Sequence, residues 1–165
     1  MPKQALLDDH ARIMAAVDAN LRMISGPRPD NFDAMAGRRW TFAREFLLHC
    51  ARDDAQILRP MTTDRRPNVA ADAVRSRADL AELVEAFKAH VQRWAGLAGE
   101  AEWPTYTRAT TALMARIRDR LFAEERGVYS YLPVQPSPRA PLAPANYAQE
   151  AWAIREAIFT GKAPA

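Results

Sequence analysis

Apolar residues recur at spacings of three and four along most of the chain, the pattern of helices that each bury one face. The first such stretch covers about residues 3–24 and ends before Gly26 and Pro27, residues typical of a helix C-terminus. The second extends from about residue 33 to 58, and Pro60 is expected to stop it. The first third of the chain therefore predicts two long amphipathic helices.

The next part of the chain repeats this arrangement after a loop expected at 61–71. A third helix is predicted over about 72–97, and a fourth over about 104–126, with Pro104 in its first turn. Each of the four predicted helices would be about 33–40 Å long, at about 1.5 Å per residue. Similar lengths and short connections predict an all-α fold, an antiparallel up-down-up-down four-helix bundle spanning residues 1–132.

The remaining residues have a different composition. Five prolines fall within residues 133–145, which predicts an extended linker. Residues 146–165 then contain a short amphipathic stretch, expected to form a C-terminal helix that packs on the bundle or on a partner. Its apolar side chains include Trp152, Ile154 and Ile158.

Composition narrows the functional classes. The 165 residues are 48% apolar and carry a net charge of +3, with basic residues interleaved among acidic ones rather than clustered. This pattern argues against a nucleic-acid surface, which would require clustered basic residues. Cys50 is the single cysteine, so no internal disulfide can form. No apolar stretch is long enough to cross a bilayer, so a cytoplasmic protein without membrane contact is expected.

Each predicted apolar face also contains polar residues that could enter the core. Residues at positions i and i+4 share one face of a helix, so His49 and Asp53 would present an imidazole and a carboxylate together. Arg120 and Glu124 have the same spacing on the fourth helix. The first and third helices each contribute a single histidine. These inward groups are the strongest functional signal in the chain, and the lone histidines are His10 and His90.

The order of these polar groups resembles the hemerythrin-like HHE cation-binding domain family over about residues 5–132. That family has a lone histidine, a His-x-x-x-Glu pair, a second lone histidine and a second His-x-x-x-Glu pair on four successive helices. The resemblance implies a non-heme di-iron centre with oxygen binding, oxygen sensing or iron handling as activities. The metal ligands that it implies here are His10, His49, Asp53, His90 and Glu124.

Two positions depart from the family pattern. Asp53 stands where the family usually has Glu and is one methylene shorter. Arg120 stands where the family has His, and a guanidinium has no lone pair with which to bind a cation. Arg120 is therefore expected to compensate charge, through pairing with Asp53 or Glu124, and to impair metal occupancy. One ion or none is expected rather than two, with iron as the first candidate and zinc as an alternative.

Three functions follow from this interpretation. The first is a hemerythrin-like binding module, rather than an enzyme, with a degenerate di-iron-type site. The second is a metal-free helical scaffold for protein interaction or homodimerisation through the C-terminal helix. The third is an oxygen- or iron-binding or sensing protein with a mono- or di-iron site. Among the neighbouring residues, Asp54 and Glu125 are expected to face outward, and Tyr129 is expected to be a packing residue at the rim.

Overall fold

A computed structural model describes residues 3–96 and 99–133 of the chain. The described residues are almost entirely helical, as expected, and contain no strand. The predicted linker at 133–145 and the predicted helix at 146–165 lie outside the described residues, apart from Pro133.

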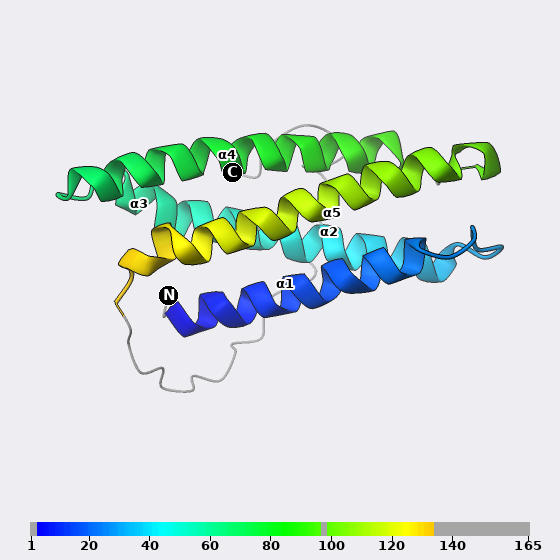
Figure 1. The fold of residues 1–165 in the computed structure, drawn as a ribbon, viewed down its shortest axis with the longest axis horizontal. Helices are drawn as coiled ribbons and strands as arrows, with labels where there is room; N and C mark the ends of the chain where they lie inside the picture. The colour runs from blue at the N-terminus through cyan, green and yellow to red at the C-terminus, as the bar shows by residue number, and fades with distance from the viewer. Residues whose placement is uncertain (1–2, 97–98, 134–165) are drawn as a thin grey trace.

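Four long helices lie side by side (Figure 1). The colour gradient in Figure 1 shows that each long helix runs opposite to the one before it. Consequently the N-terminal ends of the first and third long helices share one end of the molecule with the C-terminal ends of the other two. The four helices are α1 (Lys3–Ile24), α2 (Asp33–Asp53), α4 (Pro67–Arg93) and α5 (Trp103–Arg126).

The second predicted helix continues beyond its expected end. A π-helical segment, η1 (Asp54–Leu58), follows α2, and one further turn, α3 (Arg59–Met61), extends through Pro60. The expectation that Pro60 ends the helix is therefore wrong. Pro60 lies in the last turn of this continuous helical stretch, directly after the π-helical segment, whose hydrogen-bond pattern differs from that of a regular α-helix.

The predicted loop at 61–71 is also shorter than expected. The structure begins α4 at Pro67, where proline again suits the first helical turn. The turn before it is held by Asp64, whose carboxylate accepts hydrogen bonds from the backbone and side chain of Arg66. At its other end α4 stops at Arg93, a few residues before the expected position of 97.

The fourth long helix agrees with the prediction at both ends. A short 3-10 turn, η2 (Glu100–Glu102), precedes α5, and Pro104 lies in the first turn of α5. Gly127 caps its C-terminus, where an added Cβ would lie 2.8 Å from the carbonyl oxygen of Ala123. Glycine is required there because this distance is too short for any side chain. The chain then forms a second 3-10 turn, η3 (Val128–Tyr131).

The buried side chains form two clusters. The larger one lies between all four long helices and includes Phe46, Phe87 and Ile117. The smaller one lies at the end where α4 ends and α5 begins, and it contains Ile24, Met35, Trp94, Trp103 and Tyr106. The two ends of the molecule therefore have different interiors, and the polar groups described below lie at the end opposite the smaller, aromatic cluster.

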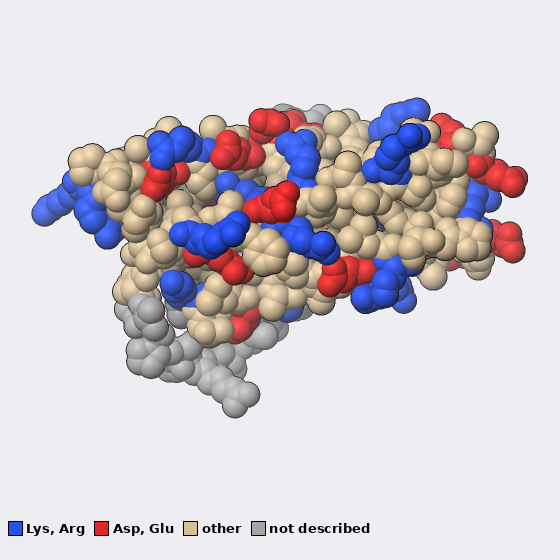
Figure 2. All heavy atoms as spheres, in the orientation of Figure 1, with Lys and Arg blue, Asp and Glu red and all other residues tan. Residues whose placement is uncertain are grey.

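The surface carries both signs of charge in close proximity. Figure 2 shows basic and acidic side chains interspersed over the face that it displays. Pairs such as Arg116 with Glu82 and Arg118 with Asp18 join neighbouring helices. None of the helices in the described part of the chain is long and apolar enough to span a membrane.

Candidate metal centre

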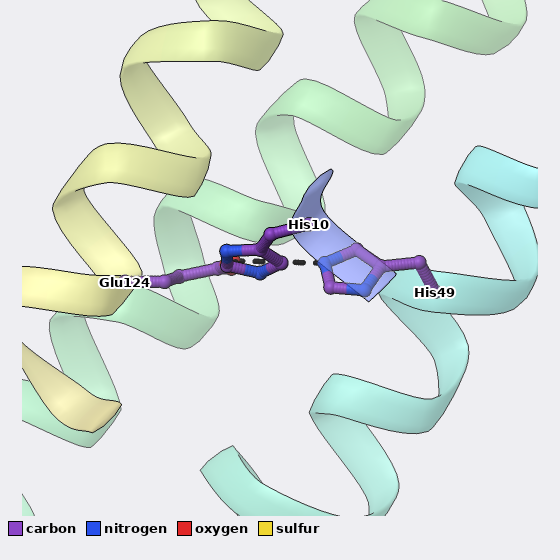
Figure 3. Close-up of side chains that lie close together, drawn as sticks. All are labelled: His10, His49 and Glu124. Atoms are coloured by element: carbon purple, nitrogen blue, oxygen red, sulfur yellow. Dashed lines mark ion pairs between the residues drawn. The ribbon is translucent and has the colours of Figure 1, made fainter. Parts of the chain in front are cut away.

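Three buried side chains from three helices point toward one another (Figure 3). One nitrogen from each imidazole of His10 and His49 and one oxygen of Glu124 all lie within 4.8 Å of one another. The Nε2 atom of His10 is 3.2 Å from Glu124 Oε2, and the Nε2 atom of His49 is 3.6 Å from the same oxygen. None of the three residues is more than 2% exposed.

The meeting of these residues follows from the alternating directions of the helices. His10 lies in the first half of α1, whereas His49 and Glu124 lie near the C-terminal ends of α2 and α5. Because neighbouring helices are antiparallel, these positions fall at the same level of the fold. Amphipathic periodicity directs each side chain inward, and the packing of the helices brings the three together.

The outer nitrogen of each imidazole is held by a second carboxylate. His49 Nδ1 donates a hydrogen bond to Asp9 Oδ2 at 3.0 Å, and His10 Nδ1 donates to Glu125 Oε1 at 2.9 Å. A carboxylate only accepts hydrogen bonds, so Nδ1 carries the proton in both rings. In a neutral imidazole the lone pair is then on Nε2, the atom that faces Glu124. Carboxylates in this position orient the histidine ligands of metals and raise their basicity.

The facing atoms have no hydrogen-bond partner. His10 Nε2, His49 Nε2 and Glu124 Oε2 are buried and form no hydrogen bond, although the oxygen lies within ion-pair distance of both nitrogens. Two atoms beside them, Asp53 Oδ2 and Arg120 Nη2, are likewise buried without a hydrogen bond. Buried polar atoms are almost always hydrogen-bonded, since leaving one unpaired costs about 1–3 kcal/mol. Five such atoms lie in this one region of the described residues.

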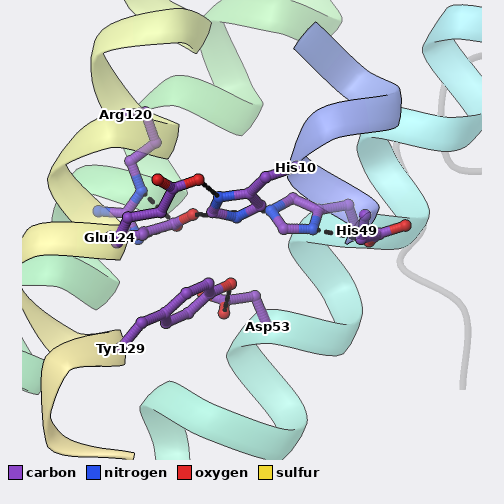
Figure 4. Close-up of polar contacts among 8 residues, drawn as sticks. His10, His49, Asp53, Arg120, Glu124 and Tyr129 are labelled. Atoms are coloured by element: carbon purple, nitrogen blue, oxygen red, sulfur yellow. Dashed lines mark hydrogen bonds and ion pairs between the residues drawn. The ribbon is translucent and has the colours of Figure 1, made fainter. Parts of the chain in front are cut away.

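Arg120 pairs with Glu124 within the same helix. Its Nε atom donates a hydrogen bond of 2.6 Å to Glu124 Oε1, and its Nη2 atom lies at the same distance from that oxygen, so Arg120 engages Oε1 and leaves Oε2 to face the histidines (Figure 4). Arg120 is 9% exposed. Of the two pairings expected for Arg120, the one along the helix is formed, and no ion pair with Asp53 is found among the described residues.

Asp53 lies beside this group but is oriented by a tyrosine. It is fully buried, and its Oδ1 accepts a hydrogen bond of 2.6 Å from the Tyr129 hydroxyl. The Tyr129 ring in turn stacks on His10, with ring centroids 5.0 Å apart. From the sequence Tyr129 was expected to pack at the rim, but Tyr129 is part of the site. Its place on η3, after the last long helix, gave no periodic signal that could have identified it.

Electrostatics distinguishes the ionisable groups of the site. Burial opposes a charge on His49, but its contacts with Asp9 and Glu124 outweigh burial and raise its pKa to about 9. Burial likewise opposes ionisation of Glu124, yet the two histidines and Arg120 lower its pKa to about 2. Asp53 differs, because burial and the nearby charge of Glu124 raise its pKa to about 6. Burial also raises the pKa of the Cys50 thiol, which keeps it protonated and unreactive.

His90 does not join this group, contrary to the prediction. It is half-buried near the C-terminal end of α4, where its Nε2 is 3.2 Å from the Thr110 hydroxyl. Thr110 lies fourteen residues before Glu124 on α5, so His90 is about 20 Å from the site along the helix axis. The antiparallel order of the helices could have revealed that His90 is distant. At the level of the site, α4 contributes residues of its N-terminal half, such as the buried Ala73, whereas His90 is near its C-terminal end.

Asp54 and Glu125, the acidic residues that directly follow Asp53 and Glu124 in the sequence, differ in their orientation. Asp54 faces outward as expected and pairs with Arg59 and Arg77. Glu125 was expected outward as well, but its side chain reaches back to His10 while remaining 35% exposed. A glutamate at the edge of a buried face is long enough to contact a buried residue and still remain partly exposed to solvent. Periodicity alone does not reveal such a contact.

No family model, curated protein or solved structure matches this chain.

Proposed function

We propose that this chain binds one divalent transition-metal ion through His10, His49 and Glu124, within a four-helix bundle of the hemerythrin type. The observation that supports this most strongly is the set of unpaired, buried donor atoms that face one another. Two imidazoles and one carboxylate are a ligand set used by zinc and by non-heme iron. The ligands of a tetrahedral zinc ion lie about 3.4 Å apart, and the distances of 3.2 Å and 3.6 Å to Glu124 Oε2 are close to that spacing. The three donor atoms together spread over as much as 4.8 Å, so the widest pair would move closer when an ion binds.

The charges of the site also favour one divalent ion. With neutral imidazoles, the surrounding carboxylates exceed the guanidinium groups by two negative charges. One divalent ion would neutralise this excess, whereas two would leave a buried region with a net positive charge. The carboxylates are those of Asp9, Asp53, Glu124 and Glu125, and the guanidinium groups are those of Arg12 and Arg120.

A di-iron centre does not fit the residues that are present. A second ion would need its own ligands, but His90 is about 20 Å away along the helix axis and Arg120 has no lone pair. Asp53 would be left as the one further donor, through its unpaired Oδ2. We therefore propose a single-ion site, with zinc or ferrous iron as occupant, in place of the paired site implied by the family resemblance.

An ion held here would link α1, α2 and α5 in the interior of the protein. All three ligand residues are buried, so the ion would be enclosed by side chains. This enclosure supports a binding role rather than turnover of a large substrate. A ligand that binds only the folded state stabilises it by RT ln(1 + [L]/Kd), about 2.7 kcal/mol at one hundred times Kd. The proposed function is thus metal binding that is coupled to the stability of the fold.

A metal titration tests this proposal. Protein stripped with a chelator would be titrated with Zn²⁺ and with Co²⁺, the latter followed by its visible absorption. We expect one equivalent to bind, and we expect the double variant His10→Ala/His49→Ala to lose it. The matched control is His90→Ala, which removes an imidazole outside the site and should leave the stoichiometry unchanged. Binding of less than a tenth of an equivalent by the wild type would refute the proposal.

A metal-free scaffold is the second candidate function, and the pKa of His49 favours it. At neutral pH a protonated His49 would itself provide a positive charge between Asp9 and Glu124, a role that a metal ion would otherwise fill. In that case the buried groups would form a closed ion-pair network that orders the core. The same titration separates the two candidates, because the scaffold requires that neither ion binds with micromolar affinity at pH 7.

A further inference from the structure

The two oxygens of Glu124 are divided between two different environments. Oε1 accepts a hydrogen bond of 2.6 Å from Nε of Arg120, and Nη2 of the same guanidinium lies at an ion-pair distance of 2.6 Å from it. Oε2 faces the Nε2 atoms of His10 and His49 and has no hydrogen-bond partner. The carboxylate can therefore offer only one oxygen to an ion placed between the imidazoles. Both residues are on the same helix, one turn apart, so this division is built into α5.

We propose that Arg120 determines which ion the site selects, by restricting Glu124 to a single oxygen. This inference rests on the proposed function. A carboxylate that binds through both oxygens increases the coordination number, which suits ions such as Mn²⁺ that favour six oxygen-rich ligands. A carboxylate that binds through one oxygen favours a low coordination number, which suits Zn²⁺. Arg120 thus acts as a specificity-determining residue that directs the site toward zinc-like ions.

The surroundings of Arg120 support a role in the site rather than on the surface. Its side chain is 8% exposed, whereas that of Arg118 on the same helix is 38% exposed and pairs with Asp18. A buried guanidinium also adds positive charge beside the ion, which disfavours an occupant of charge greater than two. Both effects of Arg120, on coordination number and on charge, select a four-coordinate divalent ion.

The experiment compares affinities for two ions in matched variants. Dissociation constants for Zn²⁺ and Mn²⁺ would be measured by competition with a fluorescent chelator for the wild type, Arg120→Gln and Arg118→Gln. Zinc binds most nitrogen and oxygen sites more tightly than manganese, so the quantity of interest is the change in the ratio of the two constants. We expect Arg120→Gln to reduce the zinc preference at least about tenfold, chiefly through tighter Mn²⁺ binding, and Arg118→Gln to leave it unchanged.

The outcomes separate this inference from the proposed function. If the wild type binds neither ion, the proposed function fails and this inference fails with it. If the wild type binds zinc but Arg120→Gln changes both affinities by the same factor, Arg120 acts through charge alone and this inference is overturned. X-ray absorption of the zinc-loaded wild type tests the same point without any variant. Four-coordinate zinc with one carboxylate oxygen would support the inference, and a carboxylate bound through both oxygens would overturn it.

Discussion

The two ends of the helical fold each contain histidine, but the surroundings change its pKa in opposite directions: His10 and His49 are buried at one end, and His90 is half-buried at the other. At one end His10 and His49 are surrounded by carboxylates, and the pKa of His49 is raised to about 9. At the other end His90 stacks on Tyr106 and lies near Arg39, so burial and that positive charge lower its pKa to about 4. The difference shows that an inward histidine on an apolar face does not by itself indicate a metal ligand. What distinguishes the two ends is the set of carboxylates that neighbouring helices supply.

The largest expected contrast between the two ends is in metal affinity. Replacing Glu124 with Gln removes the carboxylate charge that, among the described residues, faces both imidazoles, so we expect Zn²⁺ affinity to fall by at least about 100-fold. Replacing His90 with Gln should leave the affinity unchanged. Isothermal titration at pH 7 would measure both variants. Equal losses in the two variants would show that the two ends do not differ in function.

The pH dependence of stability should differ in sign between the two ends in the metal-free protein. His49 has a folded-state pKa raised from 6.5 to about 9, so its contribution is complete below about pH 6.5 and is lost as pH rises through 9. It amounts to roughly 3 kcal/mol at most. His90 has a lowered pKa, so its neutral form favours folding above about pH 6.5, and this contribution is lost as pH falls toward 4.

Urea unfolding in the presence of a chelator would measure these two effects. The free energy of unfolding of wild type minus that of His49→Gln should change with pH between about 6.5 and 9. The same quantity for His90→Gln should change between about pH 4 and 6.5. The comparison with a variant is needed because Asp53 and Glu124 also titrate in acid and contribute to the pH dependence of both proteins. Parallel pH profiles for the two variants would contradict the assigned environments.

A smaller effect is expected from the carboxylate that orients His10. We expect Glu125→Gln to weaken Zn²⁺ binding about tenfold, because an amide binds the imidazole Nδ1–H less strongly than a carboxylate does. Asp54→Asn is the matched control, since Asp54 is likewise the outer neighbour of an inward carboxylate but pairs with arginines at the surface. Similar affinities for both variants would indicate that the contact between Glu125 and His10 has no effect on the ion.

The smallest expected effect concerns the hydroxyl groups of the two ends. Tyr129→Phe removes the hydrogen bond to the buried carboxylate of Asp53 and should destabilise the metal-free protein by about 1–3 kcal/mol. Thr110→Val removes the contact to His90, which is longer and only partly buried, and should cost about 1 kcal/mol or less. Unfolding free energies at pH 7 would show whether this order holds.

Much of the secondary structure could be predicted from local patterns, and the errors have local explanations. Pro67 was expected in a loop but begins α4, a position where proline is tolerated. Pro60 was expected to end the second helix, but that helix continues through it after a π-helical segment. Within the site, the i, i+4 spacing gave the pairing of Arg120 with Glu124 as one of two alternatives, because that contact lies within one helix. The contacts of His10 with Glu125 and of Tyr129 with Asp53 span 115 and 76 residues, and no local pattern encodes them.

Helical periodicity was sufficient to locate the four long helices and to indicate most of the side chains that turn inward, because both depend on residues a few positions apart. Glu125, expected outward but in contact with His10, is an exception. It could not specify at which height along its helix each inward group meets its neighbours. That height depends on the direction and register of packed helices. These place His10, His49 and Glu124 at one end and His90 at the other, and they decide which imidazoles face carboxylates.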